Sequence, residues 1–310
     1  MTSNGIHHVT IICGPARRNL DFYTDVLGLR LVKKTVNFDD SATYHFYYGD
    51  ETGQPGTIIT FFPWEDQPAG RVGVGQALET TYRVPTDALQ FWVRRFIEKG
   101  VDFEPLTKRF GEPFLAFKDP DGVRLGLVGV PEAGDEAGYA SGTVPAQCAL
   151  RGFHGVTLME KETAPTQEIL VDVLGFSVAA HEGSFTRYRH PTAKIGGIVD
   201  IYAVGDAPKG RIGNGSIHHV AFRASDDAAQ DAMGRTLTQQ HGLPVTEQKN
   251  RKYFRSTYFS EPGGVRFEIA TDDPGFAVDE PESALGQELK LPTFLEPRRA
   301  EIAASLPALD

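Results

Sequence analysis

The chain has 310 residues, 40% of them hydrophobic, which suits two globular domains of about 150 residues each. Its 41 acidic residues outnumber the 31 basic ones, and a net charge of -10 without a basic stripe excludes nucleic acid as a partner. The sequence shows neither a signal-like opening nor an apolar run of the roughly 20 residues that cross a membrane, so we expect a soluble cytoplasmic protein without a membrane partner.

Four units of similar pattern follow one another along the chain, over residues 5–63, 76–130, 151–204 and 215–272. Three of them open with closely related runs, GIHHVT, GFHGVT and SIHHVAF, which indicates an internal repeat. Each unit reads as a strand, a helix and three further strands, a βαβββ module. One such module would leave an apolar sheet face uncovered, so we expect an α+β fold in which modules pair into two cups of curved sheet.

The helix of each module has apolar residues at helical spacing and is followed by a glycine that can adopt a left-handed conformation. In chain order the helices are expected over residues 16–27, 86–99, 167–174 and 226–240. The second and fourth modules end with almost the same phrase, DPDGVRLGL and EPGGVRFEI, which predicts a tight turn before an alternating strand.

Composition suggests where the chain divides. The run PEAGDEAGYASGTVPAQ between the second and third modules is rich in Gly, Ala, Pro and Glu, as linkers are. We therefore expect an N-terminal two-module domain over 1–135, a linker over 136–150, a C-terminal two-module domain over 151–272 and a helix-poor tail over 273–310 that wraps the body.

Positions at which the repeats differ in chemistry point to a functional site. In the opening strands, one aligned position carries His8, Glu79, Gly155 and His219. In the closing strands, another carries Thr60, Gly126, Ile201 and Glu268. Two histidines and one carboxylate thus come from the first and fourth modules only. We expect these two modules to form a metal-binding cup and the other two to form a structural one.

The set of His8, His219 and Glu268 has the composition of a facial triad, two imidazoles and one carboxylate, which is typical of non-haem iron(II). Manganese or zinc could occupy the same ligands. Cys13 and Cys148 are far apart and show no paired spacing, so a disulfide framework and a thiolate zinc site are not indicated. A single strand histidine is more often a core residue than a ligand, and the metal interpretation therefore depends on the set.

Each of the two ligand histidines follows another histidine, His7 or His218. In a regular strand these neighbours would point to the opposite face, unless a β-bulge intervenes. Either could brace the strand, support the adjacent ligand or transfer protons near neutral pH.

Longer motifs carry a resemblance to a known family. With GIHHVTI, DFYTDVLGL and the four βαβββ modules, almost the whole chain resembles the vicinal-oxygen-chelate superfamily, which includes glyoxalase I, fosfomycin-resistance proteins and extradiol dioxygenases. Within it, YHFYYGDETGQPGTIITFFP, SIHHVAF, KNRKYFRSTYFSEPGGVRFE and GFAVDE resemble the hydroquinone ring-cleaving dioxygenases.

This resemblance implies an iron(II) enzyme that inserts O2 into a hydroquinone or catechol-type aromatic ring. It implies iron ligation by His8, His219 and Glu268. It also implies supporting or substrate-pocket roles, as catalytic residues, for His7, Thr10, His218, Arg251 and Tyr258. The partners are then a small aromatic substrate and O2, and a homo-oligomer is compatible with the sequence.

Two other functions compete with ring cleavage. A glyoxalase-type isomerase or lyase would use a fourth protein ligand, and Thr60 stands at that position. A neutral hydroxyl is a weak ligand, which disfavours this activity. The other competitor is a metal-free protein that binds or sequesters a small hydrophobic molecule in the cup.

Overall fold

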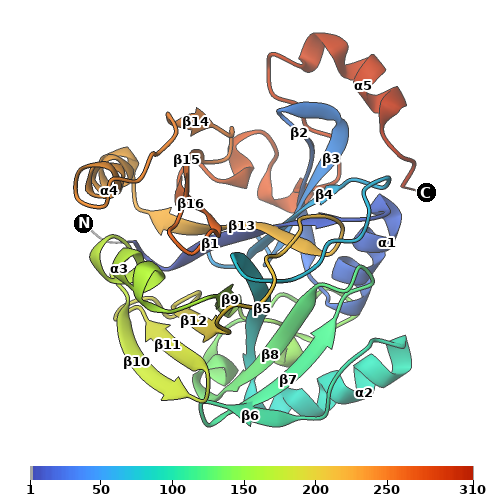
Figure 1. Cartoon of the computed structure of the whole chain (residues 1–310). Coiled ribbons are helices and arrows are strands. Elements are labelled where there is room, and N and C mark those ends of the chain that lie inside the picture. Colours follow the sequence, from blue (N-terminus) through green and yellow to red (C-terminus); the bar gives the residue numbers. More distant parts are fainter. Residues whose placement is uncertain (1–2, 310) are drawn as a thin grey trace.

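Two eight-stranded sheets form the body of the computed structural model, which describes residues 3–309; Figure 1 shows one sheet above the other. The first sheet has the order β14-β15-β16-β13-β1-β4-β3-β2. Its strands are β1 (Ile6–Cys13), β2 (Arg30–Asn37), β3 (Asp40–Gly49), β4 (Ile58–Pro63), β13 (Ser216–Ala224), β14 (Lys249–Asn250), β15 (Arg255–Ser260) and β16 (Arg266–Thr271).

The second sheet has the order β10-β11-β12-β9-β5-β8-β7-β6. Its strands are β5 (Gln76–Pro85), β6 (Thr107–Arg109), β7 (Glu112–Lys118), β8 (Arg124–Val130), β9 (Phe153–Glu160), β10 (Ser177–Glu182), β11 (Phe185–Arg189) and β12 (Ile198–Ala203).

Each sheet joins modules from different halves of the chain. In the first sheet, β1 of the first module pairs antiparallel with β13 of the fourth, and in the second, β5 pairs with β9 in the same way. The pairing converts the opening strand of each module from an edge strand into a central, buried one. The expected α+β fold and the pairing of the first module with the fourth are confirmed. The division into sequential domains stays a prediction.

The helix of every module follows its opening strand, as expected. These helices are α1 (Ala16–Asp21), which continues as a π-helical turn over Phe22–Val26, α2 (Leu89–Lys99), α3 (Ala164–Asp172) and α4 (Asp227–Gln239). The helix α2 ends at Gly100, whose φ of 65° is left-handed. The helix α4 begins after Asp226, whose side chain accepts a hydrogen bond from the backbone N–H of Ala229 at 2.8 Å.

The second cup is filled by its own side chains. The Arg187 guanidinium donates to both oxygens of Asp200 at 2.8 Å and also contacts Glu112, which accepts from His154 at 3.3 Å. Burial alone would raise the pKa of Glu112, but the His154 and Arg187 contacts lower it to about 2. The cavity left beside these residues is only about 10 Å³. Charge pairing therefore occupies the space that a ligand would need.

The strand register shows that one residue of the third module was assigned to the wrong position when the four closing strands were aligned. Thr157 of β9 lies opposite Asp200 of β12, just as Ala221 lies opposite Glu268 in the metal cup. The counterpart of Glu268 in the third module is thus Asp200, and the alignment that placed Ile201 there was wrong by one residue. Both neighbours of Asp200 are buried apolar residues, so hydrophobic alternation could not fix the register.

The tail beyond β16 lies over the edge of the first sheet, beside β2 and β3 (Figure 1). It contains the short helix α5 (Arg299–Ser305) and three 3-10 turns, over Phe276–Val278, Glu282–Ala284 and Glu296–Arg298. The fully buried Lys33 of β2 pairs with Asp279 at 2.6 Å and with Glu280. The acidic tail residues thus anchor the tail instead of serving only as solvated charge.

A buried acid lies at the end of β9. The side chain of Glu160 is 0% exposed, and neither of its oxygens has a hydrogen-bond partner among residues 3–309. Burial, together with the charge of Glu261, raises its pKa to about 8. Glu261 itself accepts hydrogen bonds from Thr166 Oγ1 and from the backbone N–H of Val265. Glu160 is therefore a neutral acid at pH 7.

This pKa predicts how stability changes with pH. The folded state holds a proton on Glu160 that the unfolded chain releases near its ordinary pKa of 4.5, so its contribution is lost as pH rises from about 4.5 to 8. We expect Glu160→Gln to raise the melting temperature at pH 9 and to leave it nearly unchanged at pH 4. Thermal melts at both pH values test this. An equal shift at the two pH values would contradict it.

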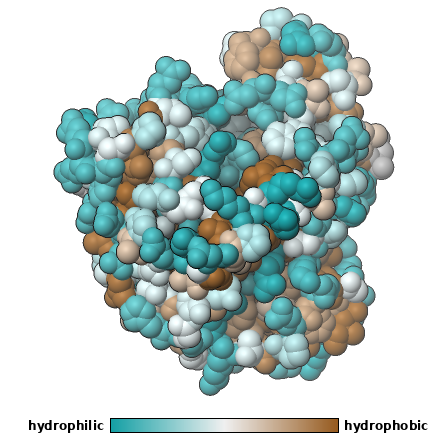
Figure 2. Space-filling view, viewed as in Figure 1, coloured by the Kyte–Doolittle hydropathy of each residue, from teal (hydrophilic) through white to brown (hydrophobic). Residues whose placement is uncertain are grey.

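The outer surface in Figure 2 is largely hydrophilic, and apolar residues form small separate patches on that face. Within residues 3–309, every helix is too short or too polar to cross a bilayer.

Candidate metal centre

Three adjacent strands of the first sheet carry the predicted ligands. His8 lies on β1, His219 on β13 and Glu268 on β16. Thr10 of β1 faces His219 across the antiparallel pair, and Ala221 of β13 faces Glu268 across the parallel one. The strand order therefore brings together residues up to 260 positions apart, since β16 and β1 both flank β13.

The ligand atoms are close enough to share one ion. His219 Nε2 lies 2.9 Å from Glu268 Oε2, and His8 Nε2 lies 3.4 Å from the same oxygen and 3.4 Å from His219 Nε2. Three ligands at right angles around a metal would be about 3 Å apart. These residues are also the one group of three or more His, Cys, Asp or Glu with metal-binding geometry among residues 3–309.

The burial and the charge of the Glu268 side chain suit it to bind a cation. Its side chain is 0% exposed, and neither oxygen accepts a hydrogen bond of good geometry from residues 3–309. Burial alone would raise its pKa, but the adjacent His8 and His219 hold the pKa well below its ordinary value. A buried carboxylate with free lone pairs between two imidazoles is a donor set for a divalent metal.

Bulges decide where the second histidine of each pair points. The β1–β13 register shifts between Ile6 and His8, and again between Thr10 and Ile11, where His218 is the extra residue on the partner strand. His7 Nδ1 then lies 2.9 Å from His8 Nδ1, and His218 Nδ1 lies 2.8 Å from His219 Nδ1. The extra residue lets each pair bend so that the rings meet.

These contacts favour one orientation of the ligand rings. When the Nδ1–H of His8 or His219 donates to its neighbour, its Nε2 lone pair is left for a metal. Burial lowers the pKa of His218 to about 3 and that of His7 well below 6.5, so both neighbours are neutral acceptors at pH 7. His218 lines the cavity, whereas His7 is buried against the ring of Phe254.

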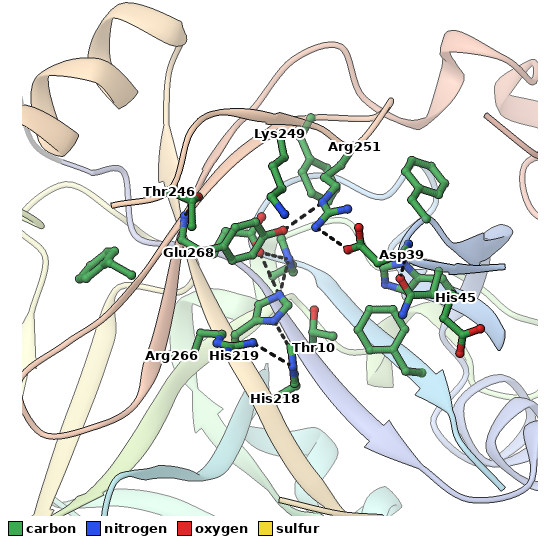
Figure 3. Close-up of a pocket in the computed structure, with 18 of the residues that line it drawn as sticks. Thr10, Asp39, His45, His218, His219, Thr246, Lys249, Arg251, Arg266 and Glu268 are labelled. Atoms are coloured by element: carbon green, nitrogen blue, oxygen red, sulfur yellow. Dashed lines mark hydrogen bonds and ion pairs between the residues drawn. The ribbon is translucent and has the colours of Figure 1, made fainter. Parts of the chain in front are cut away.

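A cavity of about 770 Å³ opens above the three ligands (Figure 3). Its walls are largely aromatic, with Phe38, Phe62, Trp64, Phe254 and Phe259 among the lining residues. A pocket of this size, with aromatic walls and charged groups that reach into it, suits a small-molecule site.

Arg251 and Tyr258, both predicted as pocket residues, line this cavity together. Arg251 Nε donates to the Tyr258 hydroxyl at 3.2 Å, and its terminal nitrogen pairs with Asp39 at 3.2 Å. Burial and the Glu268 charge raise the pKa of Tyr258, so its hydroxyl keeps its proton. That proton is available for an oxygen atom in the cavity.

Thr10 belongs to a hydrogen-bonded chain that the sequence only partly revealed. Its hydroxyl lies 2.9 Å from the Thr60 hydroxyl, which lies 2.9 Å from His45 Nε2, while His45 Nδ1 lies 3.0 Å from the Tyr47 hydroxyl. Thr60 is therefore engaged at the position where a fourth ligand would stand. His45 was missed, although the alternation in YHFYYG places His45 and Tyr47 on one strand face.

Comparison with known proteins gives the family. Residues 5–127 match the Glyoxalase/Bleomycin resistance protein/Dioxygenase superfamily. The chain is 43% identical over 302 residues to a Bacillus subtilis protein provisionally named the ring-cleaving dioxygenase MhqO, covering 97% of this chain and 95% of the relative. It is 32% identical to the chlorohydroquinone/hydroquinone 1,2-dioxygenase of Sphingobium indicum, again over 97% of this chain and 95% of the relative.

A solved structure agrees with this assignment. The crystal structure of a provisionally named dioxygenase from Bacillus subtilis superposes with a TM-score of 0.94 at 42% identity, and covers 100% of this chain and 98% of the other. The shared fold and the sequence identity extend along nearly the whole of both chains. The chain belongs to the ring-cleaving dioxygenases of the Glyoxalase/Bleomycin resistance protein/Dioxygenase superfamily.

Proposed function

We propose that this protein binds iron(II) through His8 Nε2, His219 Nε2 and a carboxylate oxygen of Glu268, and cleaves the ring of a hydroquinone-type diol. The observation that carries the proposal is the Glu268 carboxylate, buried without a hydrogen bond and 2.9 Å from His219 Nε2. Two imidazoles and one carboxylate leave open positions for other ligands, as in non-haem iron(II) oxygenases. Manganese and zinc are the competing metals.

Iron, when bound, would lower the pKa of a substrate hydroxyl and allow electrons to pass from the ring to O2. The aromatic walls would hold the ring and exclude water. Tyr258, which already accepts from Arg251 Nε, would donate its own hydrogen to the second hydroxyl of the substrate. Hydroquinone is favoured over catechol because one named relative acts on hydroquinones.

His218 would support the metal ligand beside it. It lines the cavity and its Nδ1 lies 2.8 Å from His219 Nδ1, so it would hold the His219 ring in the orientation that binds the metal. His7, which is 1% exposed and does not line the cavity, would instead orient His8. Thr10 would share the pocket floor through its bond to Thr60.

Two competing functions lose support at the same site. A glyoxalase-type isomerase would need a fourth ligand, but the Thr60 hydroxyl is neutral and bonded to Thr10 and His45. A metal-free binding protein would have no use for two imidazoles and a fully buried carboxylate whose oxygens accept no hydrogen bond of good geometry from residues 3–309.

Anaerobic reconstitution with iron(II), followed by O2 uptake and ultraviolet spectra with hydroquinones and catechols, tests the function. We expect one iron per chain and one O2 consumed per ring opened, with hydroquinones preferred. Protein that holds one iron but opens no diol would contradict the proposal. Activity with manganese but not with iron would correct the metal.

A further inference from the structure

Lys249 is a cation without an acidic partner among residues 3–309, at the start of a segment whose other cations are all paired. Its neighbours form three ion pairs: Arg251 with Asp39, Lys252 with Asp279 and Arg255 with Asp227. Lys249 forms no ion pair and no side-chain hydrogen bond in this part of the chain. Each of these three cations is thus neutralised by an acidic partner, whereas Lys249 is not.

The unpaired ammonium faces the cavity. Lys249 is half-buried and lines the pocket. Figure 3 shows its side chain entering the cavity next to Arg251, with Asp39 on the far side of the guanidinium. A second acidic residue of the cavity wall, Asp40, accepts hydrogen bonds from the Ala42 N–H and the Thr43 hydroxyl. Neither acid neutralises Lys249.

A second uncompensated cation lines the same space. Arg266 lacks an acidic partner among the described residues and lies 3.4 Å from His218 Nε2. Lys249, Arg251 and Arg266 balance the three acidic residues of the lining, Asp39, Asp40 and Glu268, so a bound divalent metal gives the cavity a surplus of positive charge, which attracts anionic ligands.

The cavity also has room beyond a bare diol ring. Its volume of about 770 Å³ lies in the upper part of the range that holds drug-sized molecules. A ring whose hydroxyls meet the metal ligands and Tyr258 would leave space towards Lys249, where Pro244, Val245 and Thr246 also form the wall. A substituent on the ring would fill that space.

We propose that the substrate is an aromatic diol with a carboxylate substituent, and that Lys249 binds this carboxylate while the diol lies at His8, His219 and Glu268. Lys249 is then a residue that determines specificity. This inference rests on the proposed function, because it assumes that the diol occupies the metal end of the cavity. It assigns the wall at Lys249 to recognition of the substituent.

A matched pair of ligands isolates the charge: a carboxylated hydroquinone and its primary amide, which is similar in size but neutral. For each we would measure kcat/KM of the iron-loaded enzyme. We would also measure anaerobic binding by quenching of Trp64 fluorescence, since Trp64 lines the cavity. We expect the wild type to prefer the acid about tenfold or more in both measurements, as one charged hydrogen bond implies.

The variant Lys249→Met should lower the acid-to-amide ratio about tenfold. Lys108→Met, at an exposed residue of β6 in the other sheet, is the control and should keep the wild-type ratio. Equal ratios in wild type and Lys249→Met, or a wild-type preference for the amide, would overturn the inference. Failure to open any diol would instead overturn the proposed function, and the binding ratio would still test Lys249.

Discussion

Replacement of Glu268 by glutamine is expected to weaken iron binding at least ~100-fold and to abolish ring cleavage, because it removes the only charged ligand of the site. Glutamine is similar in size and fits the same buried space on β16. Its neutral amide cannot balance the charge of the cation, and its NH2 group would point a donor at the ligands. Metal content after dialysis and O2 uptake with a hydroquinone measure the two effects.

Glu247→Gln is the matched control, since Glu247 is exposed and lies outside the lining of the cavity. This variant should retain one iron per chain and wild-type activity. A Glu268→Gln protein that held iron as tightly as the wild type would show that Glu268 is not a ligand. The facial triad would then have to be abandoned.

Replacement of Lys33 by methionine is expected to destabilise the protein by about 3 kcal/mol, because it leaves a buried carboxylate without its cation. Glu280 is 5% exposed and has its ion pair with Lys33, whereas Asp279 retains Lys252 at 2.7 Å. Urea unfolding followed by circular dichroism would measure the loss. The tail that crosses the edge of the first sheet should also become accessible to protease.

Two further variants separate the buried pair from a general effect of tail charge. The double variant Lys33→Met with Glu280→Gln should regain much of the lost stability, since no unpaired carboxylate remains. Glu282→Gln, two residues further along and exposed, should unfold like the wild type. A Lys33→Met protein as stable as the wild type would refute the role given to this ion pair.

The arrangement of the four modules could be predicted from the sequence, because in a repeated sequence each residue can be compared with the residues at the same position of the other modules. His8, His219 and Glu268 differ in chemistry from the equivalent residues of the middle modules, and that difference predicted which modules would pair. The helices were also readable, since each ends near a glycine such as Gly100 that adopts the left-handed conformation.

Features that depend on register or on contacts across the fold were not readable. The alignment chose Ile201 in place of Asp200 because apolar residues on both sides of β12 hide the alternation. His45 was missed since its hydrogen bond to Thr60 joins two strands. The buried ion pair of Lys33 could not be predicted from the sequence, because its partner Glu280 is 247 residues away.

The orientation of the site histidines also depends on strand pairing and could not be predicted from the sequence. A pair of histidines in a strand suggested a ligand and a helper, but a regular strand would separate their faces. The bulges at His7 and His218 bring the Nδ1 atoms of each pair within 2.9 Å, and no local signal in the sequence announced them. Bulge positions follow from how β1 and β13 pair.

The most direct test of the account is ring cleavage under dioxygen enriched in the heavy oxygen isotope, with iron-loaded enzyme and a hydroquinone. Mass spectrometry of the product would follow the label. The account predicts a ring-opened product that contains both oxygen atoms of one O2 molecule, formed by the wild type and not by Glu268→Gln. A product with an intact ring, or with no label, would contradict it.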